Sequence, residues 1–289
     1  MVRCLKVRTR IKAFLDLLKP ELPIAAGICV IAGELIGLGH VPTVMQLFMG
    51  FLTGFLISGS AMMSNDYFDI EVDRVNNPKR PLPSGRISIR EVIVFTCLFS
   101  ICGFLAAAFL GAVTLLAAVN IWAVSILYNW RGKESGIPGN MMVAFSVAST
   151  FIFGGLAVGG LTSGVVWTLG ALAFLFDLAE EIANGAMDSE GDRLRSGKSL
   201  SLLKGRKFAM RVSGVLFASF ICLSLVPFVA GWFKYPYLAV ILVADLFVAF
   251  FVCRLMRLGG SPEGRYLTRW LYLTLTVTVI AIVITRLLG

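Results

Sequence analysis

Long apolar runs recur along nearly the whole chain, and they limit what this sequence can fold into. Each run holds about 20 residues, which as an α-helix is enough to cross the hydrocarbon core of a bilayer. Hydrophobic residues make up 57% of the 289 residues, more than a soluble domain usually contains. The sequence therefore predicts an all-α, polytopic membrane protein, organised as one transmembrane domain over residues 1–289.

Nine membrane-spanning helices are predicted from these runs. A single helix over residues 91–128 would be about 57 Å long, nearly twice the hydrocarbon thickness of about 30 Å. We therefore expect a tight hairpin near Gly111 to divide that stretch into two spans. The nine spans are expected at residues 22–38, 44–66, 91–110, 112–128, 141–161, 165–187, 208–231, 236–256 and 267–287.

The basic residues predict how these spans are oriented. All but two of the 26 lysines and arginines precede the first span or lie in loops on one side, the exceptions being Lys234 and Arg286. The positive-inside rule then places the N-terminus and these loops in the cytoplasm, which agrees with an odd number of spans. The basic first 20 residues are expected to form an interfacial amphipathic helix, not a cleavable signal peptide. We expect a cell-membrane protein with no nucleic-acid partner, because no basic domain is present.

An acidic segment closes the second span. On a helix, Asn65, Asp69 and Asp73 fall at about 0°, 40° and 80°, and Asp66 falls at about 100°. Glu71 points away from this face. Carboxylates gathered on one face repel each other unless a cation lies among them, and oxygen ligands suit Mg²⁺ or Ca²⁺. The segment therefore predicts a metal site.

A second acidic stripe runs along the sixth span. Its members are spaced 4, 3, 4 and 4 residues apart and fall within one quarter of a helix: Asp177, Glu181, Asn184, Asp188 and Asp192. A solvated helix end accounts for Asp192, but Asp177 and Glu181 lie one to three turns deeper. Acidic side chains at membrane depth are costly and usually face a working cavity, so the stripe predicts function.

Basic side chains follow both acidic segments. Positive-inside topology accounts for most of them, yet carboxylates beside cations also suit a site that binds a metal and a phosphate together. The residues expected to contact phosphate are Lys19, Lys79, Arg80, Lys133, Lys198 and Asn140. The last span before Lys133 ends at Tyr128, and the glycine- and proline-containing turn that follows is expected to close over the site. Taken alone, this turn equally fits a plain connector.

Together, the two motifs Asn65-Asp66-x-x-Asp69-x-x-x-Asp73 and Asp188-x-x-x-Asp192 resemble the UbiA superfamily of intramembrane prenyltransferases. The predicted topology and the chain length also agree with that superfamily. Within it, residues 76–88 and 190–199 look most like digeranylgeranylglyceryl phosphate synthases, although chlorophyll synthases share a related Arg-Pro-x-Pro-Ser-Gly tail. One departure is the turn before Asp188, where many relatives carry a further acidic residue and this chain has Asn184 and Gly185.

The resemblance implies a reaction and a set of roles. The reaction is Mg²⁺-dependent transfer of a geranylgeranyl group from geranylgeranyl diphosphate to the hydroxyl of geranylgeranylglyceryl phosphate, a step of membrane ether-lipid biosynthesis. The implied metal ligands are Asn65, Asp66, Asp69, Asp73, Asp188 and Asp192. The implied catalytic residues are Asp66, Asp69, Asp188, Lys133 and Tyr128. The implied partners are a polyprenyl diphosphate donor, a lipid-like phosphate acceptor and membrane lipid, without a protein partner.

Two other functions fit parts of the sequence. An aromatic prenyltransferase that makes a quinone or chlorophyll precursor would share the acidic motifs. A cation-coupled transporter would also use intramembrane carboxylates, but transporter sites usually lie near the bilayer midplane in broken helices. Both acidic motifs here lie at helix ends beside cations, which favours the enzyme.

Overall fold

The computed structural model describes residues 2–187, 198–258 and 261–288, and these residues form helices without a strand. The predicted all-α class is therefore confirmed. The chain divides into two compact units: unit 1 comprises Met1–Ile31 and Thr43–Trp130, and unit 2 comprises Ala32–Pro42 and Arg131–Gly289. That both units belong to one transmembrane domain remains a prediction.

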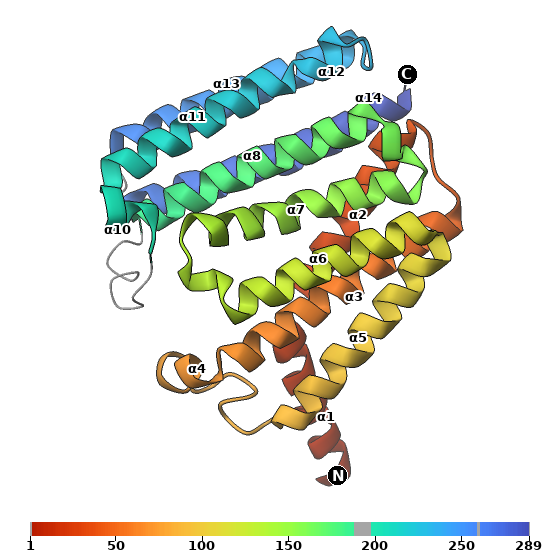
Figure 1. The fold of residues 1–289 in the computed structure, drawn as a ribbon, viewed down its shortest axis with the longest axis vertical. Helices are drawn as coiled ribbons and strands as arrows, with labels where there is room; N and C mark the ends of the chain where they lie inside the picture. The colour runs from red at the N-terminus through yellow and green to blue at the C-terminus, as the bar shows by residue number, and fades with distance from the viewer. Residues whose placement is uncertain (1, 188–197, 259–260, 289) are drawn as a thin grey trace. The chain divides into compact units, whose positions relative to one another are not determined.

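Unit 1 is built around three long helices that lie side by side, α3, α5 and α6 (Figure 1). Its helices are α1 (Val2–Leu18), the first part of α2 (Glu21–Leu38), α3 (Val44–Phe68), α4 (Ile70–Asn76), α5 (Ile89–Leu110) and α6 (Ala112–Trp130). The end of α1 packs on α3, where Leu17 and Leu18 share a core with Met63. Leu82 and Ile87, from the loop between α4 and α5, join the same core, so this loop is anchored by apolar side chains.

Local signals in the sequence fix the ends of these helices. The Ser88 side chain caps α5 by accepting a hydrogen bond from the Glu91 backbone N–H at 3.3 Å, and the Glu91 carboxylate accepts one in return from the Ser88 N–H at 2.8 Å. The α5–α6 hairpin turns at Gly111, whose φ of 139° is a conformation that favours glycine. The hairpin predicted near Gly111 is therefore confirmed.

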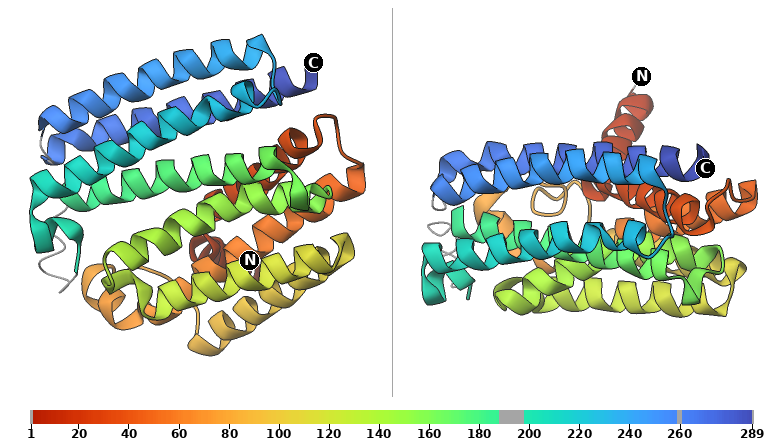
Figure 2. Two further views of the ribbon diagram at one scale, coloured as in Figure 1. Left: turned by 45° about the horizontal axis from the view of Figure 1, so that its top comes forward. Right: turned by 90° about the horizontal axis from the view of Figure 1, so that it is seen from above.

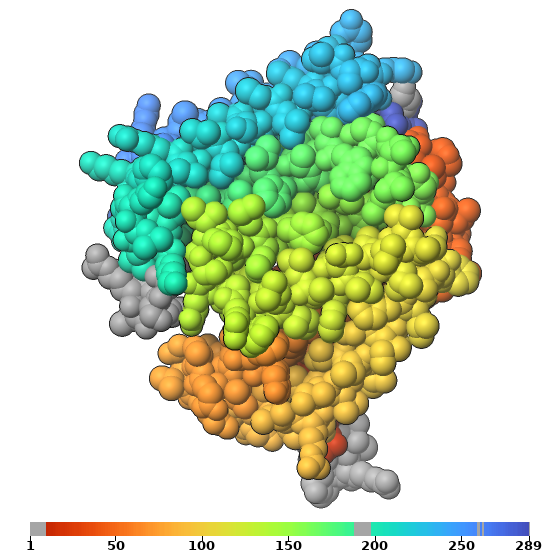
Figure 3. Space-filling view, in the orientation of Figure 1, coloured from red at the N-terminus to blue at the C-terminus, as the bar shows by residue number. Residues whose placement is uncertain are grey.

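Unit 2 contains the remaining helices, and α13 and α14 run beside each other within it (Figure 2). The described helices of unit 2 are η1 (Gly132–Glu134), α7 (Ile137–Ala157), η2 (Gly160–Thr162), α8 (Gly164–Met187), α10 (Leu200–Lys204), α11 (Arg206–Ser224), α12 (Val226–Val229), α13 (Tyr235–Leu258), η3 (Pro262–Gly264) and α14 (Arg265–Leu288). Helix α8 packs against α7 and α11, and the side chains of α8 and α11 form a continuous surface (Figure 3). The unit is completed by the last part of α2, from Ala32 onward.

Close helix contacts in unit 2 depend on small residues. A Cβ atom on Gly33 of α2 would lie 2.3 Å from the Phe151 carbonyl oxygen of α7. At the far end of α14, Arg286 donates hydrogen bonds to the carbonyl oxygens of Ile36 at 3.3 Å and Trp232 at 2.9 Å. These contacts hold the last part of α2 within unit 2.

Eight helical segments among the described residues are long and apolar enough to cross a membrane. They are α2, α3, α5, α6, α7, the α11–α12 segment (Arg206–Val229), α13 and α14. Helix α8 has 24 residues and is not among the eight, because it carries three acidic residues close together, Asp177, Glu180 and Glu181. The chain is therefore a multi-pass helical protein, while the count of nine spans and the cytoplasmic N-terminus stay predictions.

We expect Gly33→Ala to destabilise the protein by about 1–3 kcal/mol, because the added methyl group overlaps the Phe151 carbonyl group. The matched control is Gly185→Ala in α8, where a Cβ atom meets no described atom within 4 Å. The control should be neutral or gain up to about 1 kcal/mol from helix propensity. Thermal unfolding in detergent measures both effects, and equal melting temperatures for the two variants would contradict the close contact.

Candidate active site

The first acidic motif lies where α3 passes into α4. Asp69 is the residue between the two helices, with φ of −91° and ψ of 4°, so the helical path bends there. Backbone hydrogen bonds continue through the bend, from the Asp69 N–H to the Asn65 oxygen at 3.0 Å and from the Asp73 N–H to the Asp69 oxygen at 2.8 Å. The motif was expected on one straight helical face, and it instead occupies two helices joined by a bent turn.

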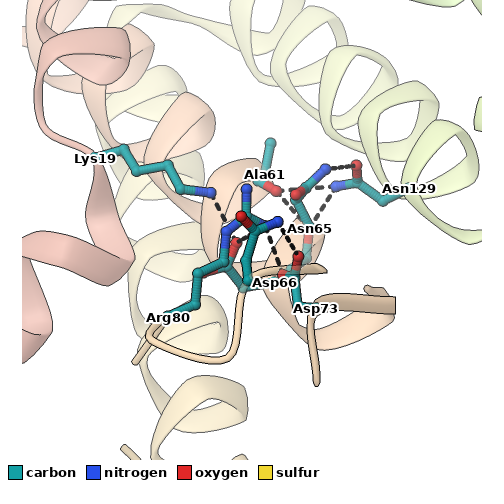
Figure 4. A network of polar contacts seen from close by, with 9 residues as sticks. Lys19, Ala61, Asn65, Asp66, Asp73, Arg80 and Asn129 are labelled. Carbon is teal, nitrogen blue, oxygen red and sulfur yellow. Dashed lines mark hydrogen bonds and ion pairs between the residues drawn. The ribbon is translucent and has the colours of Figure 1, made fainter. Parts of the chain in front are cut away.

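Two buried carboxylates of this motif are held by two cations (Figure 4). Asp66 is 1% exposed and Asp73 is 3% exposed. The Lys19 Nζ lies 2.7 Å from Asp66 Oδ1. The Arg80 Nη1 lies 2.5 Å from Asp73 Oδ2 and 3.6 Å from Asp66 Oδ1, so one guanidinium group bridges both carboxylates. The structure thus brings together four residues that the sequence predicted for the site.

Lys19 reaches this network from an uncommon backbone conformation. Its φ is 49°, and it is the only residue other than glycine with a positive φ in the described part of the chain. Its N–H donates to the Leu15 carbonyl oxygen at 2.9 Å, which ends α1 and turns the chain into α2. Non-glycine residues rarely adopt such angles unless their surroundings hold them, and they are frequent at functional sites.

Asn65 is oriented by a residue that the sequence did not single out. Its Nδ2 donates to the Asn129 Oδ1 at 3.1 Å, and Asn129 in turn donates to the Ala61 carbonyl oxygen and the Ser64 Oγ, each at 2.9 Å (Figure 4). Asn129 is 6% exposed and lies on α6, next to Tyr128. Because the two asparagines are 64 residues apart, no local spacing could have revealed this pair.

The chemistry of the motif fits a hard divalent cation. Asp66 Oδ2 is buried and has no hydrogen-bond partner among the described residues. A buried carboxylate oxygen without a donor is poorly satisfied, and it is the type of ligand that Mg²⁺ or Ca²⁺ takes. The described residues contain no arrangement of three or more His, Cys, Asp or Glu side chains that could hold a metal. The predicted ligands Asp188 and Asp192 lie outside the described residues.

Unit 2 places three other predicted residues near one another. Gly136, with φ of 72°, packs so closely on the Lys198 backbone that a Cβ atom would lie 2.1 Å from the Lys198 oxygen. Lys133 lies just before this turn, in η1. The Gly136 carbonyl oxygen accepts a hydrogen bond from the Asn140 backbone N–H at 3.0 Å. The backbone segments that carry Lys133, Asn140 and Lys198 therefore meet at the turn around Gly136. Tyr128 is half-buried at the end of α6 in unit 1.

Two acidic residues of α8 are buried, Asp177 and Glu180, and only the first belongs to the predicted stripe. Glu180, which is 1% exposed, accepts hydrogen bonds from the Asn184 side chain and from the Tyr272 Oη, the latter at 2.9 Å. Asp177 is 4% exposed, and its Oδ2 has no hydrogen-bond partner among the described residues. The predicted stripe included Glu181, which is half-buried, and missed Glu180 because the spacing argument places it on another face.

Comparison of the sequence with known proteins connects it to one group of enzymes. Residues 26–273 match the UbiA prenyltransferase family. The digeranylgeranylglyceryl phosphate synthase of Pyrococcus abyssi is 34% identical over 221 residues, which cover 76% of this chain and 79% of the relative. The synthase of the same name from Methanopyrus kandleri is 36% identical over 233 residues, covering 81% of this chain and 84% of the relative.

Solved structures agree with the sequence matches. A structure of a digeranylgeranylglyceryl phosphate synthase superposes with a TM-score of 0.87 at 26% identity, covering 97% of this chain and 99% of the other. A UbiA homologue from Archaeoglobus fulgidus bound to GPP and Mg²⁺ gives a TM-score of 0.73 at 18% identity, covering 95% and 99%. At that lower identity the likeness shows the shared fold alone.

We expect Arg80→Gln to lower the melting temperature, because it removes the cation that bridges two buried carboxylates. Breaking a buried pair costs about 3–5 kcal/mol, and the partial exposure of Arg80 reduces the expected loss to about 2–3 kcal/mol. Adding Asp73→Asn to this variant should restore part of the loss. Arg74→Gln is the control, since Arg74 pairs with exposed Glu71. Thermal unfolding in detergent compares the wild type with the single, double and control variants. A double variant that melts no higher than Arg80→Gln would contradict the bridge.

Proposed function

Because the chain belongs to the UbiA prenyltransferase family, we propose that it transfers a geranylgeranyl group from geranylgeranyl diphosphate to the hydroxyl of geranylgeranylglyceryl phosphate. The observation that carries the proposal is the pair of buried carboxylates, Asp66 and Asp73, held beside Lys19 and Arg80 where α3 passes into α4. This pairing supplies metal ligands and phosphate-binding cations at one place. Membership of a prenyltransferase family also argues against the cation-coupled transporter considered from the sequence.

The proposed reaction breaks one bond and forms another at the same carbon. The bond between C1 of the donor and the bridging oxygen breaks, and diphosphate leaves with the electron pair. The acceptor hydroxyl oxygen forms the new bond to C1 and loses its proton. Negative charge grows on the departing diphosphate, so cations fixed in advance near it lower the barrier. Lys19 and Arg80 are fixed in this way, because each is held by a buried carboxylate.

We propose Mg²⁺ as the cofactor, held by oxygen ligands of the two acidic motifs. When bound, the metal would supply Lewis-acid stabilisation of the diphosphate leaving group. Asp66 is suited to this role by its buried, unpartnered Oδ2. The other proposed ligands are Asn65, Asp69, Asp73, Asp188 and Asp192.

Other residues are proposed to bind phosphate or to act in the reaction. Lys133, Asn140 and Lys198 lie on backbone segments that meet at the turn around Gly136, and we propose that their side chains bind phosphate oxygens. Lys133 and Tyr128 are the proposed catalytic residues besides Asp66, Asp69 and Asp188. The distribution of lysine and arginine supports a cell-membrane enzyme whose chemistry takes place at the cytoplasmic face. Helix α8, 24 residues long, is the proposed ninth span.

Loss of a metal ligand should abolish the chemistry without unfolding the protein. We expect Asp69→Ala and Asp188→Ala each to lower Mg²⁺-dependent diphosphate release from geranylgeranyl diphosphate at least 100-fold. Glu71→Ala should release diphosphate at the wild-type rate, because Glu71 is exposed and pairs only with Arg74 among the described residues. The assay uses detergent-solubilised protein. Undiminished release by both aspartate variants would show that the enzymatic proposal is wrong.

The acceptor is tested by product analysis. Geranylgeranyl diphosphate is offered together with one acceptor at a time: geranylgeranylglyceryl phosphate, 4-hydroxybenzoate or chlorophyllide. We expect an ether product with the first acceptor only, because similarity to the archaeal synthases supports a lipid phosphate acceptor. A prenylated aromatic product alone, identified by mass spectrometry, would support the aromatic prenyltransferase instead.

A further inference from the structure

A pocket of about 770 Å³ lies beside the ion-pair network in unit 1. This volume is within the range of about 300–1,000 Å³ that small-molecule sites occupy. The pocket is formed by the end of α1, the start of α2 and the loop after α4. The cations that line it are Lys19, Lys79, Arg80 and Arg86, and the acidic residues that line it are Asp16 and Glu21.

The four cationic side chains differ in whether they already pair with a carboxylate of the protein. Lys19 and Arg80 pair with the buried carboxylates of the first acidic motif. The Arg86 guanidinium group donates to Asp16 Oδ2 and to the Lys79 carbonyl oxygen, each at 2.7 Å. The Lys79 side chain is exposed and has no ion-pair partner among the described residues, while its backbone is fixed by Arg86. Lys79 is therefore the cation most ready to bind an anion from outside the chain.

The wall of the pocket distinguishes between two kinds of phosphate ligand. Neither Asp66 nor Asp73 lines it, so an anion in the pocket does not contact the two carboxylates proposed to bind a metal. The acidic side chains that do line it are Asp16, which pairs with Arg86 at 2.7 Å, and Glu21, and four cations line the same wall. A diphosphate that binds through Mg²⁺ needs Asp66 and Asp73, whereas a monophosphate is satisfied by lysine and arginine alone. Leu15 and Pro20 add apolar surface to the same wall, which suits a phosphate attached to a hydrocarbon chain.

We infer that this pocket binds the phosphate of the lipid-like acceptor, with Lys79 as its main contact. The inference rests on the proposed function, because it assigns one of the two substrates to this part of the site. Lys19 and Arg80 line the pocket and also contact Asp66, so the acceptor phosphate lies one side chain away from the proposed metal ligands. The pocket thereby positions the acceptor next to the donor without sharing the metal.

The test measures binding without metal, in phosphatidylcholine nanodiscs that contain EDTA. Isothermal calorimetry compares geranylgeranylglyceryl phosphate with geranylgeranylglycerol, which lacks the phosphate. We expect Lys79→Gln to weaken binding of the phosphorylated compound about 10-fold and to leave binding of the other unchanged. Arg90→Gln is the control, since Arg90 is exposed at the start of α5 and does not line the pocket. The Lys79 substitution leaves intact the hydrogen bond from Arg86, which is made to the backbone.

A kinetic experiment then measures KM separately for the acceptor and for the donor. In Lys79→Gln the KM for the phosphorylated acceptor should rise about 10-fold, while the KM for geranylgeranyl diphosphate stays within twofold of wild type. A rise in the donor KM alone, or equal weakening of both compounds in EDTA, would overturn the inference. If phosphatidic acid added to the nanodiscs loses affinity in the variant while the acceptor does not, the pocket holds bulk lipid and the inference is also wrong. Failure of the wild type to form product while EDTA binding follows the expected pattern would contradict the proposed function and support the pocket.

Discussion

Two carboxylates are buried where α3 passes into α4, and the segments around them depend on how these charges are paired. Asp66 and Asp73 are almost fully removed from solvent, and an unpaired carboxylate in that position would be strongly unfavourable. Cations must therefore come to them, and they come from segments distant in sequence: Lys19 from the end of α1, and Arg80 from the loop after α4. The pairing of two buried charges thus acts together with the apolar core around Met63 in holding the α1–α2 turn and the basic loop in place.

The same interaction supports the proposed role of these residues in the reaction. Arg80 contacts both carboxylates through one guanidinium nitrogen, so it offsets their mutual repulsion. Buried ion pairs contribute little net stability because desolvation offsets the Coulomb attraction, so stability alone does not explain why two acidic side chains are placed here. Asp66 Oδ2 has no hydrogen bond among the described residues, which leaves a carboxylate oxygen open to a ligand at this place. The proposed metal and diphosphate are such ligands.

Features encoded over short stretches of sequence were predictable, and features formed by distant residues were not. The apolar runs located the long helices, and excessive length alone placed the hairpin at Gly111, where α5 ends and α6 begins. Helical angles predicted that Asp66 and Asp73 share one face, although they missed the bend at Asp69. The hydrogen bond between Asn65 and Asn129 joins positions 64 residues apart, and that between Glu180 and Tyr272 joins positions 92 apart. No periodicity relates such pairs.

The two substrates of the proposed reaction both carry phosphate, so the enzyme needs a physical means of telling them apart. Charge alone gives none, because lysine and arginine attract either group. The balance of charge around each place does: beside Asp66 and Asp73 a phosphate needs a metal to offset their repulsion. In the pocket around Lys79, four cations line the wall against two acidic side chains, Asp16 and Glu21, and Asp16 already pairs with Arg86. A diphosphate with bound Mg²⁺ is then favoured at the first place and a bare monophosphate at the second. In the proposed arrangement Lys19 and Arg80 contribute to both places, so the two phosphates would lie side by side and the metal would distinguish donor from acceptor.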